Sequence, residues 1–172
     1  MKSDKSAPDP RRLRVASVQF ECAPGDKEAN FRKIEFFTEQ AARRGARLVV
    51  FPEACITGYW FMRNLSEKAL AQLAEPVFEG PSAQRLIALA KQFDLTIGAG
   101  FVEAGPAGAF YNSYVVAMPD GRAQCHRKLH AFEHPLMRSG SEFTVFNLPD
   151  GFRVGVLICY DCNLIENVRL TA

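Results

Sequence analysis

One stretch decides the fold, Arg153-Val-Gly-Val-Leu-Ile-Cys-Tyr-Asp-Cys-Asn-Leu-Ile-Glu-Asn-Val-Arg169. Its residues 154–158 form a β-branched-rich apolar run, which predicts a strand buried on both faces. Asp161 is a residue type that caps helices, and a helical turn is expected near Glu166. Cys159 therefore lies at a strand-to-helix junction, where backbone N–H groups and a helix dipole stabilise a thiolate. This junction indicates a nucleophile, although a single cysteine is more often a buried, inert residue.

Upstream of this stretch, strands and helices alternate along the chain. Residues 13–20 alternate in polarity as a strand does, and Asp26 is a suitable N-cap for the helix that follows. In that helix, over 27–44, apolar residues recur at spacings of three and four, which predicts an amphipathic helix. Residues 48–51 then form a short buried strand. A strand, a helix and a strand within about forty residues indicate the α/β class.

The middle of the chain continues this pattern. A second amphipathic helix is expected after Gly80-Pro81-Ser82, and a strand over 95–102 contains Gly98 and Gly100. Two glycines in one strand predict a close approach of another segment. The turn Pro119-Asp-Gly-Arg122 is expected to join two strands, over 111–118 and 123–127, into a hairpin.

Composition indicates one ordinary globular domain of 172 residues, with 48% hydrophobic and 23% charged residues. The net charge of +2 gives no reason to expect nucleic acid or a membrane surface as a partner. Residues 1–12 lack the apolar segment of a signal peptide and are predicted to be a disordered tail before a domain over 13–172. Five cysteines, an odd number, favour free thiols and a cytoplasmic location.

Three residues at predicted strand ends have a common chemical logic. Glu53 follows a buried strand and precedes an apolar segment, which would desolvate its carboxyl and raise its pKa. Lys128 ends the hairpin, where its ammonium suits a developing oxyanion, although spacing alone equally allows a solvated basic edge. If these two meet Cys159, the glutamate accepts the thiol proton and the thiolate attacks an unsaturated carbon.

The sequence resembles the nitrilase, or carbon–nitrogen hydrolase, superfamily. The matching motifs are Phe51-Pro-Glu-Ala-Cys-Ile-Thr-Gly-Tyr59, His126-Arg-Lys128 and Val156-Leu-Ile-Cys-Tyr-Asp161, in the family's order and spacing. The resemblance implies an α-β-β-α sandwich in which Glu53, Lys128 and Cys159 form the catalytic triad. The Cys-Tyr-Asp sequence is similar to that of amidase-type branches. The expected reaction is hydrolysis of a non-peptide carbon–nitrogen bond in a small amide, carbamoyl compound or nitrile through a cysteine thioester.

The resemblance also implies roles for other residues. A second glutamate that helps position the substrate and the nucleophile falls on Glu133, with Glu142 as the less favoured candidate. The backbone N–H of Tyr160 would complete the oxyanion hole with Lys128. Asp161 matches one of the family's structural residues. We expect Tyr59, Trp60 and Phe132 to line the substrate pocket, although ordinary core positions explain them equally well.

The family needs no metal or organic cofactor, and its members commonly form homo-oligomers. Its members also continue well past the nucleophile, so the chain corresponds to the N-terminal portion of the sandwich. This shortness makes a catalytically inactive interaction module one alternative. Two further alternatives are a redox protein built on Cys159-Tyr-Asp-Cys162 and a zinc site built on Cys125, His126, His130 and His134.

Overall fold

The computed structural model describes residues 12–172. Its main element is a five-stranded sheet of β1 (Val15–Ser17), β2 (Leu48–Val50), β3 (Thr96–Ala104), β4 (Phe110–Ala117) and β5 (Ala123–Arg127), in that spatial order. The pairs β1–β2 and β2–β3 are parallel, whereas β3–β4 and β4–β5 are antiparallel. The predicted α/β pattern and the hairpin are confirmed.

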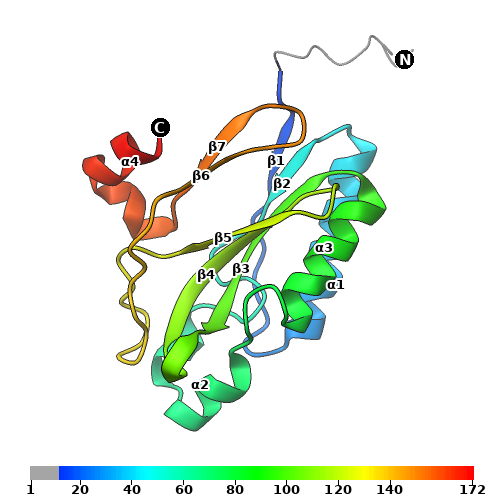
Figure 1. Cartoon of the computed structure of the whole chain (residues 1–172). Coiled ribbons are helices and arrows are strands. Elements are labelled where there is room, and N and C mark those ends of the chain that lie inside the picture. Colours follow the sequence, from blue (N-terminus) through cyan, green and yellow to red (C-terminus); the bar gives the residue numbers. More distant parts are fainter. Residues whose placement is uncertain (1–11) are drawn as a thin grey trace.

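Two helices cover one face of this sheet (Figure 1). Helix α1 (Lys27–Arg43) begins where the Asp26 side chain accepts a hydrogen bond from the N–H of Ala29 at 2.8 Å. Helix α3 (Pro81–Phe93) begins with proline at its first position, where the missing N–H costs no hydrogen bond. A shorter helix, α2 (Glu67–Leu73), lies near the far end of β3 and β4.

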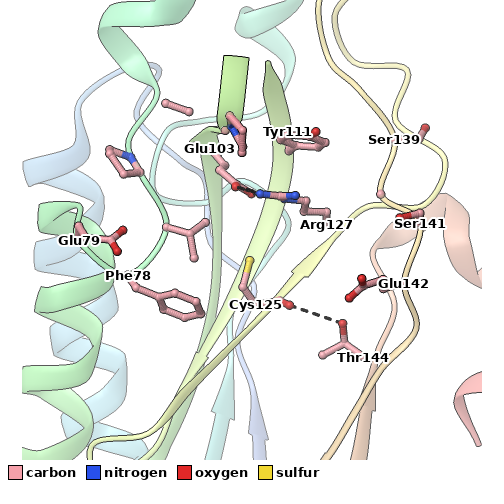
Figure 2. Close-up of a pocket in the computed structure, with 16 residues that line it drawn as sticks. Phe78, Glu79, Glu103, Tyr111, Cys125, Arg127, Ser139, Ser141, Glu142 and Thr144 are labelled. Atoms are coloured by element: carbon pink, nitrogen blue, oxygen red, sulfur yellow. Dashed lines mark hydrogen bonds and ion pairs between the residues drawn. The ribbon is translucent and has the colours of Figure 1, made fainter. Parts of the chain in front are cut away.

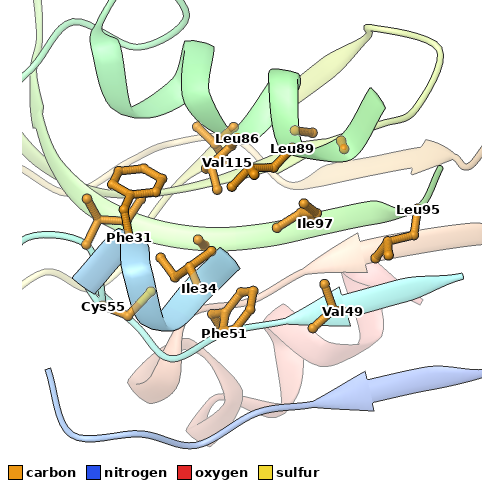
Figure 3. Close-up of a cluster of buried hydrophobic side chains, with 14 of the residues drawn as sticks. Phe31, Ile34, Val49, Phe51, Cys55, Leu86, Leu89, Leu95, Ile97 and Val115 are labelled. Atoms are coloured by element: carbon orange, nitrogen blue, oxygen red, sulfur yellow. The ribbon is translucent and has the colours of Figure 1, made fainter. Parts of the chain in front are cut away.

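The main core lies between these helices and the sheet (Figure 3). Phe31 and Ile34 project from α1, Leu86 and Leu89 from α3, and Val49, Ile97 and Val115 from the strands. Every member of this set has at most 5% of its surface exposed. The three- and four-residue spacing on the helices and the two-residue spacing on the strands therefore direct apolar side chains to one common layer.

On the opposite side of the sheet stands a hairpin of β6 (Thr144–Asn147) and β7 (Arg153–Val156), followed by α4 (Ile165–Thr171) (Figure 1). Together these layers form the N-terminal portion of an α-β-β-α sandwich. Two expectations for this region were wrong. Strand β7 is only half-buried, because β6 is its one partner strand in residues 12–172. Asp161 does not cap α4, whose N-cap is Leu164.

The two glycines of β3 mark a close approach, as predicted. A Cβ on Gly98 would lie 2.7 Å from the ring of Tyr114, and one on Gly100 would lie 2.5 Å from the backbone nitrogen of Ala54. The segment after β2 therefore passes directly over β3, which brings Glu53 onto the face of the sheet away from α1 and α3.

The predicted tail over 1–12 lies almost wholly outside the described residues, so it stays a prediction, as does the domain boundary. Within residues 12–172, none of the helices combines the length and the apolar character that a membrane span requires.

Candidate active site

Glu53 lies just beyond the end of β2, where Pro52 and a turn through Ala54 (φ 48°) redirect the chain. Its Oε1 accepts hydrogen bonds from Asn112 Nδ2 and from Lys128 Nζ, both at 2.7 Å. Burial raises the pKa of Glu53 above its usual range, although these two hydrogen bonds act in the opposite direction. The apolar segment after Glu53 predicted this direction from the sequence.

Lys128 directly follows β5, and its side chain is fully buried. Its ammonium donates to Glu53 Oε1 and to Glu133 Oε1, and so lies between two carboxylates. Burial alone would lower the pKa of Lys128, but the hydrogen bonds and charges of these carboxylates outweigh it and raise that pKa. An ammonium has three N–H donors, so one remains for a further acceptor.

The structure distinguishes between the two candidates for the second glutamate. Glu133 is 2% exposed, contacts Lys128, and accepts a hydrogen bond from the N–H of Phe132 at 3.1 Å through its Oε2. Glu142 instead lies exposed at the rim of a separate hollow on the helix-covered side of the sheet, with Tyr111 and Arg127 (Figure 2). The triad region therefore contains Glu133 and not Glu142.

Cys159 opens a short 3₁₀ turn (Cys159–Asn163) after β7, with φ at +48° and an exposed side chain. Partial burial and, after it, the charge of Glu53 raise the pKa of this thiol. Lys128 and the N–H of Tyr160 lower the pKa, but by less. The expectation of a stabilised thiolate was therefore wrong, because partial burial and the neighbouring carboxylate both disfavour the charged form of the thiol.

Asp161 connects the cysteine turn to the lysine segment. Its buried carboxylate accepts hydrogen bonds from the backbone N–H groups of Ile158 (3.1 Å), Leu129 (3.2 Å) and His130 (3.0 Å). His126 approaches the same carboxylate at 3.4 Å. Burial alone would raise the pKa of Asp161, but these hydrogen bonds together hold it below its usual range. Leu129 directly follows Lys128, and Ile158 directly precedes Cys159. The Asp161 carboxylate therefore fixes the spacing between the Lys128 segment and the Cys159 segment.

Aromatic side chains surround these groups. Tyr59 is half-buried, and burial, with the charge of Glu53, raises the pKa of its phenol to about 12. The Phe132 ring centroid lies 4.5 Å from Lys128 Nζ, and its ring meets that of Tyr160 edge-on. Trp60 is 58% exposed and packs against Tyr59 and the Arg63 guanidinium. Phe132 thus contacts the polar cluster directly, whereas Trp60 packs on Tyr59.

A cavity of about 310 Å³ adjoins Glu53 and Cys159 between the sheet and the β6–β7 hairpin. Its other walls are largely apolar and include Val50 and Val116 from the sheet and Val156 from β7. The site therefore combines a buried polar cluster with an apolar wall on one side.

The side chains named for a zinc site are held apart by other contacts. His126 bonds to Thr144 and Asp161, and His134 bonds to the carbonyl of Leu65. Across residues 12–172, no three His, Cys, Asp or Glu side chains are grouped as a metal ion would require. Cys159 and Cys162 are both free thiols, which adds no support to the redox alternative.

Sequence reasoning missed Asn112 and Tyr114, both of which contact the Glu53 segment. A polar residue inside a strand gives no sign of its partner, which here lies about sixty positions away. The two-residue spacing of Asn112 and Tyr114 places both on one face of β4 but does not indicate what either side chain contacts.

Residues 14–172 match the model of the carbon-nitrogen hydrolase family, and the chain belongs to that family. An (R)-stereoselective amidase from a Pseudomonas species is 39% identical over 73% of this chain and 43% of its own length. An omega-amidase from Xenopus laevis is 31% identical over 94% of this chain and 59% of its own length.

Solved structures show the same fold. Nit3 of Saccharomyces cerevisiae, a member of branch 10 of the nitrilase superfamily, superimposes with a TM-score of 0.79 at 28% identity. The match covers 92% of this chain and 59% of Nit3. An amidase from Nesterenkonia has a TM-score of 0.74 at 23% identity, which supports the fold alone. The chain thus matches between 43% and 59% of the length of these relatives.

Proposed function

We propose that the protein hydrolyses a non-peptide carbon–nitrogen bond of a small amide, carbamoyl compound or nitrile through a thioester on Cys159. One observation carries this proposal: the Lys128 ammonium lies between Glu53 and Glu133, and Glu53 and Cys159 line the same cavity. A base, an oxyanion-binding cation and a nucleophile thereby meet in one place. This convergence favours an enzyme over an inactive interaction module.

In the proposed first half-reaction, Glu53 accepts the thiol proton as the sulfur attacks the substrate carbon. Both hydrogen bonds of Glu53 to Asn112 and Lys128 end on Oε1, which leaves Oε2 to accept this proton. Because the thiol pKa is raised, the thiolate needs this base in order to form at neutral pH. The raised pKa of Glu53 makes its protonated form easier to reach.

The attack on an amide creates an oxyanion, which the third N–H of Lys128 and the backbone N–H of Tyr160 are proposed to stabilise. Glu53 then returns its proton to the nitrogen, the carbon–nitrogen bond breaks, and ammonia or an amine leaves. A water molecule, deprotonated by Glu53, attacks the remaining thioester. The carbon–sulfur bond breaks, and the thiolate recovers its proton to release the acid.

Glu133 is proposed to position Lys128, since its carboxylate is held by the N–H of Phe132 and bonds to the ammonium. Tyr59, Trp60 and Phe132 are proposed to line the substrate pocket. Among substrates we favour the amide, on the Cys159-Tyr-Asp161 sequence and the names of the relatives. We also propose a cytoplasmic location, supported by five free thiols, and a homo-oligomeric assembly, supported only by the family resemblance.

The test is ammonia release from a panel of short aliphatic amides and nitriles. Cys159→Ala is expected to abolish release and to leave the unfolding temperature within a degree or two of the wild-type value. Cys162→Ala is the matched control, because Cys162 is an exposed free thiol in the same turn, and it should retain activity. Activity retained by Cys159→Ala, or lost equally in both variants, would refute the assignment of the nucleophile.

A further inference from the structure

Strand β4 places two further polar side chains on the sheet face that bears Glu53. Positions 112 and 114 share this face because strand side chains alternate. In the register of the hairpin, Tyr114 lies opposite His126, and the N–H of Lys128 donates to the carbonyl of Asn112 at 2.9 Å. Neither Asn112 nor Tyr114 takes part in the proton and nucleophile chemistry proposed above.

Tyr114 reaches across a whole strand. Its ring lies over Gly98 of β3, and its hydroxyl meets the end of β2 beyond it. The hydroxyl lies 2.8 Å from the carbonyl oxygens of Phe51 and Gly98, and accepts from the N–H of Phe51 at 3.1 Å. One phenol therefore holds both backbone polar groups of Phe51, two residues before Glu53.

Only a glycine at position 98 leaves room for the Tyr114 side chain. A Cβ on Gly98 would lie 2.7 Å from Tyr114 Cε1 and 3.0 Å from its hydroxyl oxygen. A second restraint on the Glu53 segment follows this residue in the sequence. There the N–H of Ile56 donates to the carbonyl of Gly100 at 3.0 Å. The Glu53 turn is thus tied to β3 and β4 both before and after the carboxylate.

Asn112 acts on the carboxylate itself. It is 1% exposed, and its Nδ2 donates to Glu53 Oε1 at 2.7 Å, the same oxygen that accepts from Lys128. Its Oδ1 is buried and has no hydrogen-bond partner within residues 12–172. A buried acceptor left unpaired is unfavourable for folding alone, so stability does not explain why an asparagine occupies this position.

We propose that Asn112 and Tyr114 are positioning residues for Glu53: Tyr114 fixes the backbone that carries the base, and Asn112 fixes the orientation of its carboxylate toward the Cys159 thiol. This inference rests on the proposed function, in which Glu53 is the base. Both residues act through Glu53 and not on the substrate. Loss of either should displace Glu53 from its position beside the cavity that it shares with Cys159, while the sheet persists.

The experiment measures the rate of Cys159 alkylation by iodoacetamide against pH, read by peptide mass on the 172-residue chain. Glu53 raises the thiol pKa, so a displaced Glu53 lowers the midpoint of this profile. Tyr114→Phe and Asn112→Ala are expected to move the midpoint toward that of Glu53→Gln. A shift of about half a pH unit corresponds to a roughly threefold faster reaction near neutral pH.

Tyr111→Phe is the matched control, because Tyr111 lies on the same strand and lines the separate hollow of Figure 2. This variant also loses a phenol hydroxyl, and it should keep the wild-type pH profile of Cys159 alkylation. Thermal unfolding of each variant checks that the fold is retained, and Asn112→Ser replaces Asn112→Ala if the latter does not fold. A general loss of stability would speed the alkylation of buried Cys55 as well, whereas positioning affects Cys159 alone.

The outcomes separate the two proposals. If Glu53→Gln shifts the profile and both Tyr114→Phe and Asn112→Ala keep the wild-type midpoint, the positioning roles are refuted and the proposed function stands. If Glu53→Gln itself leaves the profile unchanged, the effect of Glu53 on the thiol is refuted, and the positioning roles with it. Shifts in both β4 variants without one in Tyr111→Phe support the inference.

Discussion

The two halves of the candidate site are built differently. Glu53 and Lys128 follow strands β2 and β5 of a five-stranded sheet backed by two helices, Glu133 lies in the loop after β5, and the side chain of Lys128 is fully buried. Cys159 lies exposed at the end of a two-stranded hairpin whose strand β7 is half-buried. The Glu53 and Lys128 side chains are thus preorganised by the sheet, whereas Asp161 holds the turn that carries Cys159 against them.

The largest effect is expected from Lys128→Met, which leaves Glu53 and Glu133 without their shared cation. Removing one partner from a buried ion pair typically costs about 3–5 kcal/mol, so the free energy of unfolding at pH 7 should fall by roughly that amount. Acid should relieve the loss, because protonated carboxyls need no cation. Urea unfolding at pH 7 and pH 4 measures both effects. Lys68→Met, at an exposed position, is the control; equal losses in the two variants would contradict the account.

A smaller loss, about 2–3 kcal/mol, is expected from Asp161→Asn, which replaces a buried acceptor of several N–H groups. The native pKa of Asp161 lies below its unfolded value, so its contribution is present above the unfolded pKa. It is lost as the pH falls through the native pKa. The difference from wild type should therefore shrink below about pH 4, near the reference pKa of aspartate.

The same substitution tests the link between the two regions. In Asp161→Asn, the turn that carries Cys159 is released from the segment after Lys128. The rate of Cys159 alkylation should then be the same whether or not Glu53 is also replaced by glutamine. Asp120→Asn is the control, because Asp120 is an exposed residue whose hydrogen bonds are to Arg122. If the loss of unfolding free energy in Asp161→Asn relative to wild type stays constant down to pH 3, the assigned role of the carboxylate is contradicted.

The smallest effects are expected from valine substitutions that compare the packing of the two sheets. Val115 on β4 is fully buried, so Val115→Ala should cost about 2 kcal/mol through the lost methyl groups and the cavity that they leave. Val156 on β7 is half-buried, and Val156→Ala should cost less than about 1 kcal/mol. Urea denaturation of this pair checks the contrast, since both variants make the same chemical change in a strand. Equal losses would mean that the hairpin is packed as tightly as the sheet.

Much of the fold could be predicted from the sequence because its signals are local. The helix over 27–44 was read from apolar spacing and its Asp26 cap, and α1 has nearly those bounds. The glycines at 98 and 100 predicted a close approach that Tyr114 and Ala54 supply. The burial of β7 was predicted wrongly, because an apolar run does not reveal how many layers will cover it.

For the site, the sequence indicated which residue types occupy strand ends but not how they interact. Apolar residues after Glu53 predicted the direction of its pKa, since burial is a local property. The pKa of Cys159 was predicted in the wrong direction, because its main electrostatic neighbour lies more than a hundred positions away. Asn112 was missed for the same reason. Interactions between segments distant in sequence depend on the strand order and register, which residue patterns alone do not determine.

The most direct test of the account is to trap the acyl-enzyme. The protein would be incubated with a short aliphatic amide, quenched in acid, digested and analysed by mass, with Glu53→Gln and Cys162→Ala in parallel. We predict an acyl group on Cys159 in the wild type and in Cys162→Ala, and its absence in Glu53→Gln. An unmodified Cys159, or an acyl group on another cysteine, would contradict the claim that Glu53, Lys128 and Cys159 form a working site.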